Sequence, residues 1–124
     1  MERFPVVGAL LVVLVTAWSL SSSSLASAET PEVVSASYLG GGAKEDVVSI
    51  VTDGKGFAYV TGSTWSNDFP ISGEVVQDTK GAFQDAFIAK IDLSTHAIVF
   101  STFLGGEGMD EGRAIEVAED GWIV

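Results

Sequence analysis

Short apolar runs alternate with glycine-containing turns along most of the chain. Residues 47–53 and 57–62 are rich in β-branched and aromatic residues, and they flank the turn DGKG at residues 53–56. Glycine supplies the positive φ that such turns need, so this pattern predicts a β-hairpin. The same pattern predicts further strands at residues 86–92, 97–104, 113–118 and 122–124.

The predicted strands are apolar on both faces. Phe87, Ala89 and Ile91 lie on one side of their run, and Ile88 lies on the other. A sheet with one solvated face would alternate more cleanly, whereas stacked sheets, such as the blades of a propeller, bury both faces. No helical period is present beyond the first 28 residues. These features predict an all-β fold of stacked antiparallel sheets.

Two stretches of the chain match each other without a gap, 65 positions apart (103 − 38 = 65). One begins at Tyr38-Leu39-Gly40-Gly41 and the other at Phe103-Leu104-Gly105-Gly106. A fixed internal period indicates a repeat array. One complete copy and part of a second are present, so we expect an incomplete ring that lacks neighbouring blades.

The segment between the second and third predicted strands, residues 63–85, is long for a hairpin loop. We expect Trp65 and Phe69-Pro70 to seal the edge of the blade rather than to bind a ligand. An insertion of this length also explains a period above the usual 40–50 residues of a propeller blade.

The first 28 residues have the features of a secretory signal peptide. Met1-Glu2-Arg3 precedes an apolar run over residues 4–20, and Ala26-Ser27-Ala28 provides a cleavage site with small residues. We expect a signal helix at residues 1–28, cleavage before Glu29, and a lead-in at residues 29–36. An uncleaved membrane anchor is the alternative, although Pro5 and Gly8 weaken the run as a membrane helix.

Several elements of the chain resemble the bacterial SBBP beta-propeller repeat. They are YLGG at residues 38–41, D-x-x-G-x-x-YVTGST at 53–64, DFP at 68–70, DAFIAKI at 85–91 and STFLGG at 101–106. The resemblance implies four-stranded antiparallel blades around a central axis over residues 37–124, usually in exported or surface proteins. It implies no enzyme activity, because the family has no agreed catalytic residues.

Charge and composition narrow the functional classes. The formal net charge is −11, which disfavours nucleic acid and anionic membranes as partners, since both are bound through Lys and Arg. The chain has no cysteine, which excludes disulfides, thiol catalysis and thiolate metal sites. His96 is the single histidine, so a histidine-rich zinc site is impossible within this chain.

Two acidic pairs, Glu45-Asp46 and Asp110-Glu111, each follow a glycine-rich turn and precede a predicted strand. Calcium prefers carboxylate and carbonyl oxygens, so these pairs are the candidate cation ligands. Carboxylates at strand ends more often cap turn amides, which is our expectation here. Among the acidic residues, a catalytic pair for glycoside hydrolysis would require two carboxylates held across a sugar, and no pair is singled out.

The remaining candidates have structural interpretations. His96 is expected to be exposed in a turn. The glycine runs at residues 40–42 and 54–56 precede no helix, unlike a phosphate-binding loop. Four aromatic residues could stack on a sugar but fit core positions, namely Tyr38, Tyr59, Trp65 and Trp122. We assign no catalytic, cofactor-binding or metal-binding residue.

The sequence therefore predicts an exported or cell-surface β-propeller repeat protein that acts as a binding or structural module, with loops such as residues 67–81 carrying recognition. Its ligand would be a protein or a glycan. One alternative is the N-terminal part of a secreted propeller enzyme, for example a carbohydrate-active one. The other is a calcium-stabilised adhesion module.

Overall fold

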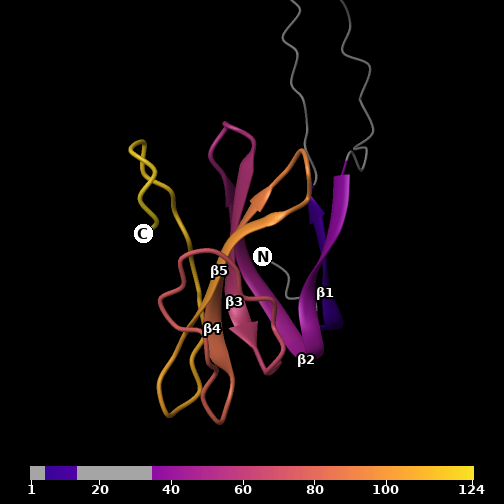
Figure 1. Ribbon diagram of the computed structural model, residues 1–124, viewed down its shortest axis with the longest axis vertical. Coiled ribbons are helices and arrows are strands. Elements are labelled where there is room, and N and C mark those ends of the chain that lie inside the picture. Colours follow the sequence, from indigo (N-terminus) through magenta and orange to yellow (C-terminus); the bar gives the residue numbers. More distant parts are fainter. Residues whose placement is uncertain (1–4, 14–34) are drawn as a thin grey trace, which may run out of the picture.

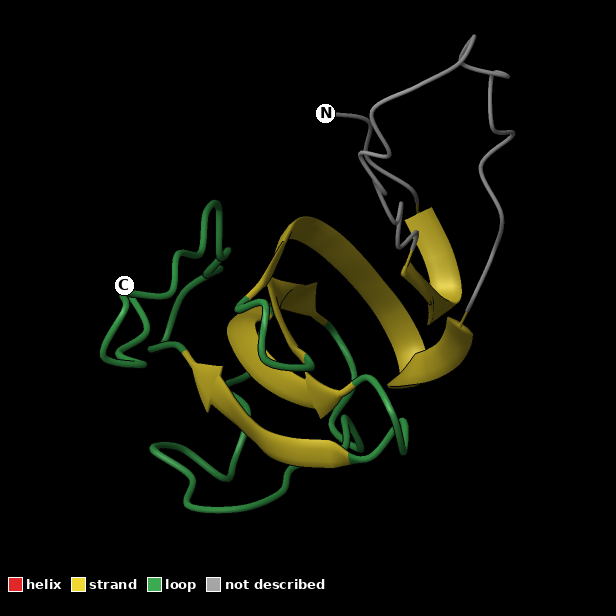
Figure 2. Cartoon of the chain, turned by 90° about the horizontal axis from the view of Figure 1, so that it is seen from above, coloured by secondary structure: helices red, strands yellow, loops and turns green. Residues whose placement is uncertain are grey.

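The computed structural model describes residues 5–13 and 35–124, which form one antiparallel sheet of five strands in sequential order (Figure 1). The strands are β1 (Pro5–Val13), β2 (Ser35–Thr52), β3 (Phe57–Thr64), β4 (Asp85–Asp92) and β5 (Ile98–Leu104). The sheet is twisted rather than flat (Figure 2), as the chirality of the strands requires. The all-β prediction is confirmed, and β2–β5 form the expected four-stranded antiparallel meander.

Side-chain caps hold the two tight hairpins. Between β2 and β3, Asp53 Oδ1 accepts the N–H groups of Lys55 and Phe57, at 2.7 and 3.2 Å. Gly54 and Gly56 have φ values of 70° and 98°, so this turn needs glycine at both positions. Between β4 and β5, Asp92 Oδ1 accepts the N–H groups of Ser94 and Thr95. Both hairpins were predicted, the first from its glycine-containing turn and the second from the two apolar runs that flank it.

β1 corrects the expectation of a helix within the first 28 residues. Residues 5–13 form a strand that pairs with residues 35–46 of β2. The four valines in this segment favour a strand, and its proline and glycine disfavour a helix. Pairing also gives partners to the backbone groups along this edge of β2. The rest of the predicted signal peptide and most of the lead-in, residues 1–4 and 14–34, lie outside the described residues. No helix in the described part of the chain is long and apolar enough to cross a membrane.

The core lies on one face of the β2–β5 sheet. Val60, Phe87 and Phe103 are almost completely buried, and Phe69 reaches in from the loop between β3 and β4. The Phe69 ring lies 4.6 Å from the Phe87 ring and 6.0 Å from the Phe103 ring, centroid to centroid. Phe69 therefore seals the blade as predicted. Trp65 is 39% exposed and does not.

The same loop covers the outer edge of β5. Ser72 and Ser101 exchange backbone hydrogen bonds, and the Phe103 N–H donates to the Gln77 carbonyl. The Thr102 hydroxyl accepts the N–H groups of Val76 and Gln77. The 63–85 segment thus gives partners to the backbone groups that an edge strand leaves unpaired.

The second copy of the repeat crosses the other face of β3. The Gly112 N–H donates to the Gly62 carbonyl at 3.0 Å, and Ile115 is buried. A Cβ at Gly112 would overlap Thr61 Oγ1, so glycine permits this close approach. β3 is consequently buried on both faces from Ala58 to Thr64, as the sequence pattern predicted.

The chain ends in a short hairpin that lies on the side of the sheet away from β1 (Figure 1). Glu116 and Val124 exchange backbone hydrogen bonds, and the Ala118 N–H donates to the Trp122 carbonyl. The strands predicted at residues 113–118 and 122–124 are reduced to an isolated bridge between Val117 and Ile123.

Candidate functional site

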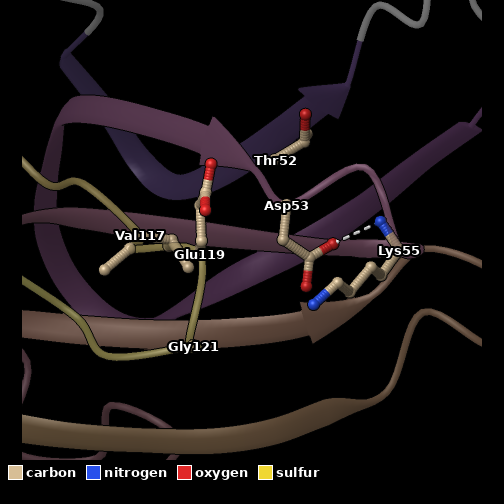
Figure 3. Close-up of a pocket in the computed structure, with 7 residues that line it drawn as sticks. Thr52, Asp53, Lys55, Val117, Glu119 and Gly121 are labelled. Carbon is tan, nitrogen blue, oxygen red and sulfur yellow. Dashed lines mark hydrogen bonds between the residues drawn. The ribbon is translucent and has the colours of Figure 1, made fainter.

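A pocket of about 310 Å³ lies between two copies of the same turn (Figure 3). The first copy contributes the end of β2 and the turn after it, and the second contributes the C-terminal hairpin. The residue pairs Thr52 and Val117, and Asp53 and Ala118, are each 65 positions apart, as the internal period requires (117 − 52 = 65). The complete lining is Thr52, Asp53, Lys55, Val117, Ala118, Glu119 and Gly121.

Asp53 is the organising group of this pocket. Its Oδ1 atom holds the turn, and its Oδ2 atom accepts a hydrogen bond from the Tyr59 hydroxyl at 3.5 Å. Partial desolvation opposes ionisation, but the N–H groups of Lys55 and Phe57, with the charges of Lys90 and Lys55, outweigh it and lower the pKa of Asp53. Asp53 is therefore ionised at neutral pH.

The charges around the pocket are mixed. Glu119 comes from the second copy and lines the pocket together with Asp53 and Lys55 of the first (Figure 3). The Lys90 ammonium group lies 4.2 Å from the centroid of the Phe57 ring and 5.3 Å from that of Tyr59. The pocket lining offers the carboxylates of Asp53 and Glu119 as acceptors and the Lys55 ammonium group as a donor. These groups suit a ligand that carries hydroxyl or charged groups.

Glu45, from the first acidic pair, is a buried structural residue. It is 1% exposed, and its Oε1 atom accepts hydrogen bonds from the hydroxyls of Thr64 and Ser66. The Ala43 N–H donates to the Ser66 hydroxyl, and the Ser66 N–H donates to the Thr64 hydroxyl. This network joins β2 to the end of β3. Glu45 Oε2 has no hydrogen-bond partner.

The other three carboxylates of the acidic pairs have local partners. Asp46 forms an ion pair with Lys44 at 2.8 Å, and Glu111 forms one with Arg113 at 3.3 Å. Asp110 Oδ2 accepts the Gly106 N–H at 2.8 Å, which is the expected cap of a turn amide. Within residues 5–13 and 35–124, no three histidine or acidic side chains gather as a metal-binding group.

The remaining sequence candidates occupy structural or exposed positions. His96 is exposed in the β4–β5 turn, as predicted, with a φ of 62°. The glycine run at residues 40–42 lies within β2, where the Gly42 N–H donates to Asp68 Oδ1 at 2.8 Å. The expectation that all four aromatics are core residues is correct for Tyr59, which is 3% exposed. It is wrong for the others, since they are 39–73% exposed: Tyr38, Trp65 and Trp122.

Sequence reasoning missed the burial of Asp85, which lies outside the pocket. Asp85 is fully buried at the start of β4, and its Oδ2 atom accepts hydrogen bonds from the Gln77 amide and the Gly81 N–H. Its Oδ1 atom has no hydrogen-bond partner. A Cβ at Gly105 would overlap this carboxylate, which explains the first glycine of that pair. The sequence signal that could have drawn attention to Asp85 is its position directly before an apolar strand.

One comparison with known proteins supports the sequence elements within residues 38–70. No curated protein and no solved structure was found to match the chain. A family model, the SBBP beta-propeller repeat, matches residues 36–70, which span most of β2, all of β3 and the start of the following loop. Residues 36–70 are therefore similar to the SBBP beta-propeller repeat, the family that the sequence elements resemble.

Proposed function

We propose that this chain is an exported SBBP-repeat protein that acts as a binding or structural module at the cell surface. The stacking of the second repeat copy on β3 carries the proposal, because it places two equivalent turns side by side and leaves a pocket between them. Repeat proteins characteristically present binding surfaces built from equivalent loops of successive units.

The exposed turns are the parts of this fold that are free to specialise. Asp53 and Ala118 occupy equivalent positions, yet only the first provides a carboxylate. Glu119 likewise stands where the first copy has Gly54. Loops on a rigid scaffold can vary in this way without disturbing the core. A glycan or a polar protein surface fits the mixed charges of the pocket.

Binding can be tested by applying the purified full chain to a glycan array and to immobilised extracts of surface proteins. A double variant, Lys55→Ala with Glu119→Ala, should lose at least about tenfold in affinity for any ligand found, since charged hydrogen bonds contribute about 1.5–3 kcal/mol each. Glu107→Ala, an exposed carboxylate outside the pocket, is the matched control. Equal binding by all three proteins would remove the pocket from the proposal.

Export rests on the charged start, the apolar run and the Ala26-Ser27-Ala28 site. N-terminal sequencing of the protein recovered outside expressing bacteria should give Glu29 as the first residue. An intact Met1 in protein that stays in the cytoplasm would contradict export, whatever the binding experiment gives.

The calcium-stabilised module is a second candidate, and one observation favours it. Glu45 Oε2 and Asp85 Oδ1 are buried carboxylate oxygens without hydrogen-bond partners. Glu45 on β2 and Asp85 on β4 are both cross-strand partners of Thr64 on β3. Millimolar calcium should then raise the melting temperature, and a chelator should reverse the rise. An unchanged melting temperature with both reagents would eliminate this candidate.

A further inference from the structure

Each copy of the turn is followed by an aromatic residue at an equivalent position. Phe57 in the first copy corresponds to Trp122 in the second (57 + 65 = 122). The Phe57 carbonyl accepts the Asp53 N–H, and the Trp122 carbonyl accepts the Ala118 N–H in the same way. The glycines directly before the two aromatic residues have φ values of 98° and 89°. The two hairpins therefore present their aromatic residues from equivalent backbone positions.

In the first copy, a lysine side chain occupies the aromatic surface. Lys90 on β4 lies opposite Tyr59 in the register of the sheet. Its ammonium group lies 4.2 Å from the centroid of the Phe57 ring, which is half-buried in this arrangement. An ammonium group within about 6 Å of a ring centroid is attracted by the negative face of the ring. The chain itself thus shows which chemical group this aromatic position accepts.

In the second copy, the aromatic surface is open to solvent. Trp122 is 73% exposed, and tryptophan attracts cations more strongly than phenylalanine or tyrosine does. Trp122 directly follows Gly121 and is hydrogen-bonded to Ala118, and both of these neighbours line the pocket between the two turns. An ammonium group bound at Trp122 would therefore lie at the edge of this pocket.

The charges of the second turn also favour a cation. The first turn carries Asp53 and Lys55, whose charges cancel. The second turn carries Glu119 and Asp120, and Asp120 stands where the first copy has Lys55 (55 + 65 = 120). Both acidic residues are exposed, and the whole chain has a formal net charge of −11. A field of this sign attracts a positively charged partner and speeds its association.

We propose that Trp122, Glu119 and Asp120 bind a lysine side chain of a partner protein. The bound ammonium group lies on the indole ring as that of Lys90 lies on Phe57, and the two carboxylates balance its charge. The choice of ligand rests on the proposed binding function, because Glu119 lines the same pocket.

A lysine side chain in a peptide suits this site better than an amino sugar does. Lysine lays its four methylene groups along apolar surface while its ammonium group stays in water, so the stem can cover part of the exposed indole. Lys55 lines the same pocket and supplies a donor for the main-chain carbonyl groups of a peptide. A sugar with a free amine has no comparable stem. The site therefore favours a protein partner.

The test titrates the isotopically labelled full chain with a five-residue peptide that has one lysine between pairs of glycines. Amide signals of residues 116–124 report binding, and peptide concentrations up to about 10 mM cover the weak affinity of a single side chain. The control peptide has norleucine in place of lysine, which keeps the four-carbon stem and removes the charge. The lysine peptide should bind at least about fivefold more tightly than the norleucine peptide.

Variants separate the ring from the carboxylates. Trp122→Ala should remove the preference for lysine, and Trp122→Phe should restore part of it, because phenylalanine keeps an aromatic face. Glu119→Gln with Asp120→Asn should weaken binding of the lysine peptide at least about threefold and leave the norleucine peptide unchanged. Trp65→Ala removes another exposed tryptophan outside the pocket, so this matched control should keep the full preference. Hydrogen exchange of the β3 and β4 amides confirms that each variant is folded.

Three outcomes would overturn the proposal. The first is equal binding of the two peptides, or a preference for lysine that survives Trp122→Ala. The second is binding of a chitosan oligomer in place of the lysine peptide, which would identify an amino sugar as the source of the ammonium group. The third is a neutral glycan whose binding depends on Lys55 and Glu119. That result would keep the pocket of the proposed function and exclude the lysine ligand, so the two failures are distinguishable.

Discussion

Individual carboxylates hold the turns and strand ends of this protein. Asp53 and Asp92 each accept backbone N–H groups from the turn directly after them. Glu45 accepts two hydroxyl groups where β2 meets the end of β3. The two turn carboxylates could be recognised from the sequence, because their partners are two to four residues away. The burial of Glu45 could not, since Ser66 reaches it only after the chain has turned back along β3.

The pKa of Asp92 is lowered by hydrogen bonds from the Ser94 hydroxyl first, and then from the N–H groups of Ser94 and Thr95. A lowered folded-state pKa means that the stabilisation is complete above the usual value of 3.8 and is lost as the pH falls through the folded pKa. Asp92→Asn removes the titrating group. Its urea-unfolding free energy should therefore decline less than that of the parent chain from about pH 5 to about pH 2.

Glu107→Gln serves as the control for this pH series, because it removes an exposed carboxylate elsewhere on the surface. It should leave the pH dependence of unfolding unchanged. The same decline in the parent chain and in Asp92→Asn would show that Asp92 does not contribute to the pH dependence.

Substitution of Glu45 should separate hydrogen bonding from charge. Glu45→Ala leaves the buried Ser66 and Thr64 hydroxyls without their acceptor and should cost about 1–3 kcal/mol of unfolding free energy. Glu45→Gln keeps an acceptor oxygen and removes the charge, so it should cost less than the alanine variant. Chemical denaturation measures both. An alanine variant as stable as the parent chain would refute this role for the network.

At the scale of elements, the sequence predicted the hairpins but not the segments that pack against them. The glycine-containing turn at residues 53–56 and the apolar runs on either side of residues 93–96 predicted the β2–β3 and β4–β5 connections correctly. The length of β2 was not predictable, because its first half is a strand only through pairing with β1. Likewise, Phe69 and Trp65 both belong to the 63–85 segment, but Phe69 meets the aromatic rings of β4 and β5 whereas Trp65 is 39% exposed.

The crossing of the second copy over β3 should depend on Gly112. A Cβ there would overlap Thr61 Oγ1 and press on the backbone of Gly62. Gly112→Ala should lower the unfolding free energy by about 1–3 kcal/mol, as overpacking does in a close contact. It should also speed hydrogen exchange at the Gly112 and Glu116 amides, which are bonded in this segment.

Gly108→Ala is a matched control, because a Cβ at Gly108 meets nothing within 4 Å. It lies in the same connection and should change stability by no more than about 0.5 kcal/mol. Equal effects of the two substitutions would mean that the close approach at Gly112 does not hold the second copy on the sheet.

At the scale of the whole molecule, stability comes from the contact between repeats as well as from each blade. β3 is buried on both faces, and the second copy lies across one of them. Trp122 and Val124 remain 73% and 78% exposed, whereas their counterparts Phe57 and Tyr59 are half-buried and buried. The first hairpin differs in being packed against β4, which places Lys90 over Phe57 and Tyr59.

Extending the array should therefore stabilise it. A chain with residues 60–124 repeated after Val124 continues the 65-residue period without a gap (60 + 65 = 125). Its urea midpoint should rise, because stability in repeat proteins grows with the number of interfaces between neighbours. An extension with the same residues in scrambled order should give no rise. A midpoint unaffected by the true repeat would contradict a repeat array.

The sequence by itself determined the strand-and-turn pattern, the 65-residue period and the resemblance of residues 36–70 to a repeat family, because each of these is recorded in residues close together or at a constant spacing. The tertiary structure alone decided which surfaces are covered. The pocket between two turns, the burial of Glu45 and Asp85, the covered edge of β5 and the pairing of β1 all join residues distant in the chain. Such contacts depend on which distant segments the fold brings together. The backbone groups at a strand edge can pair with any strand that presents matching donors and acceptors.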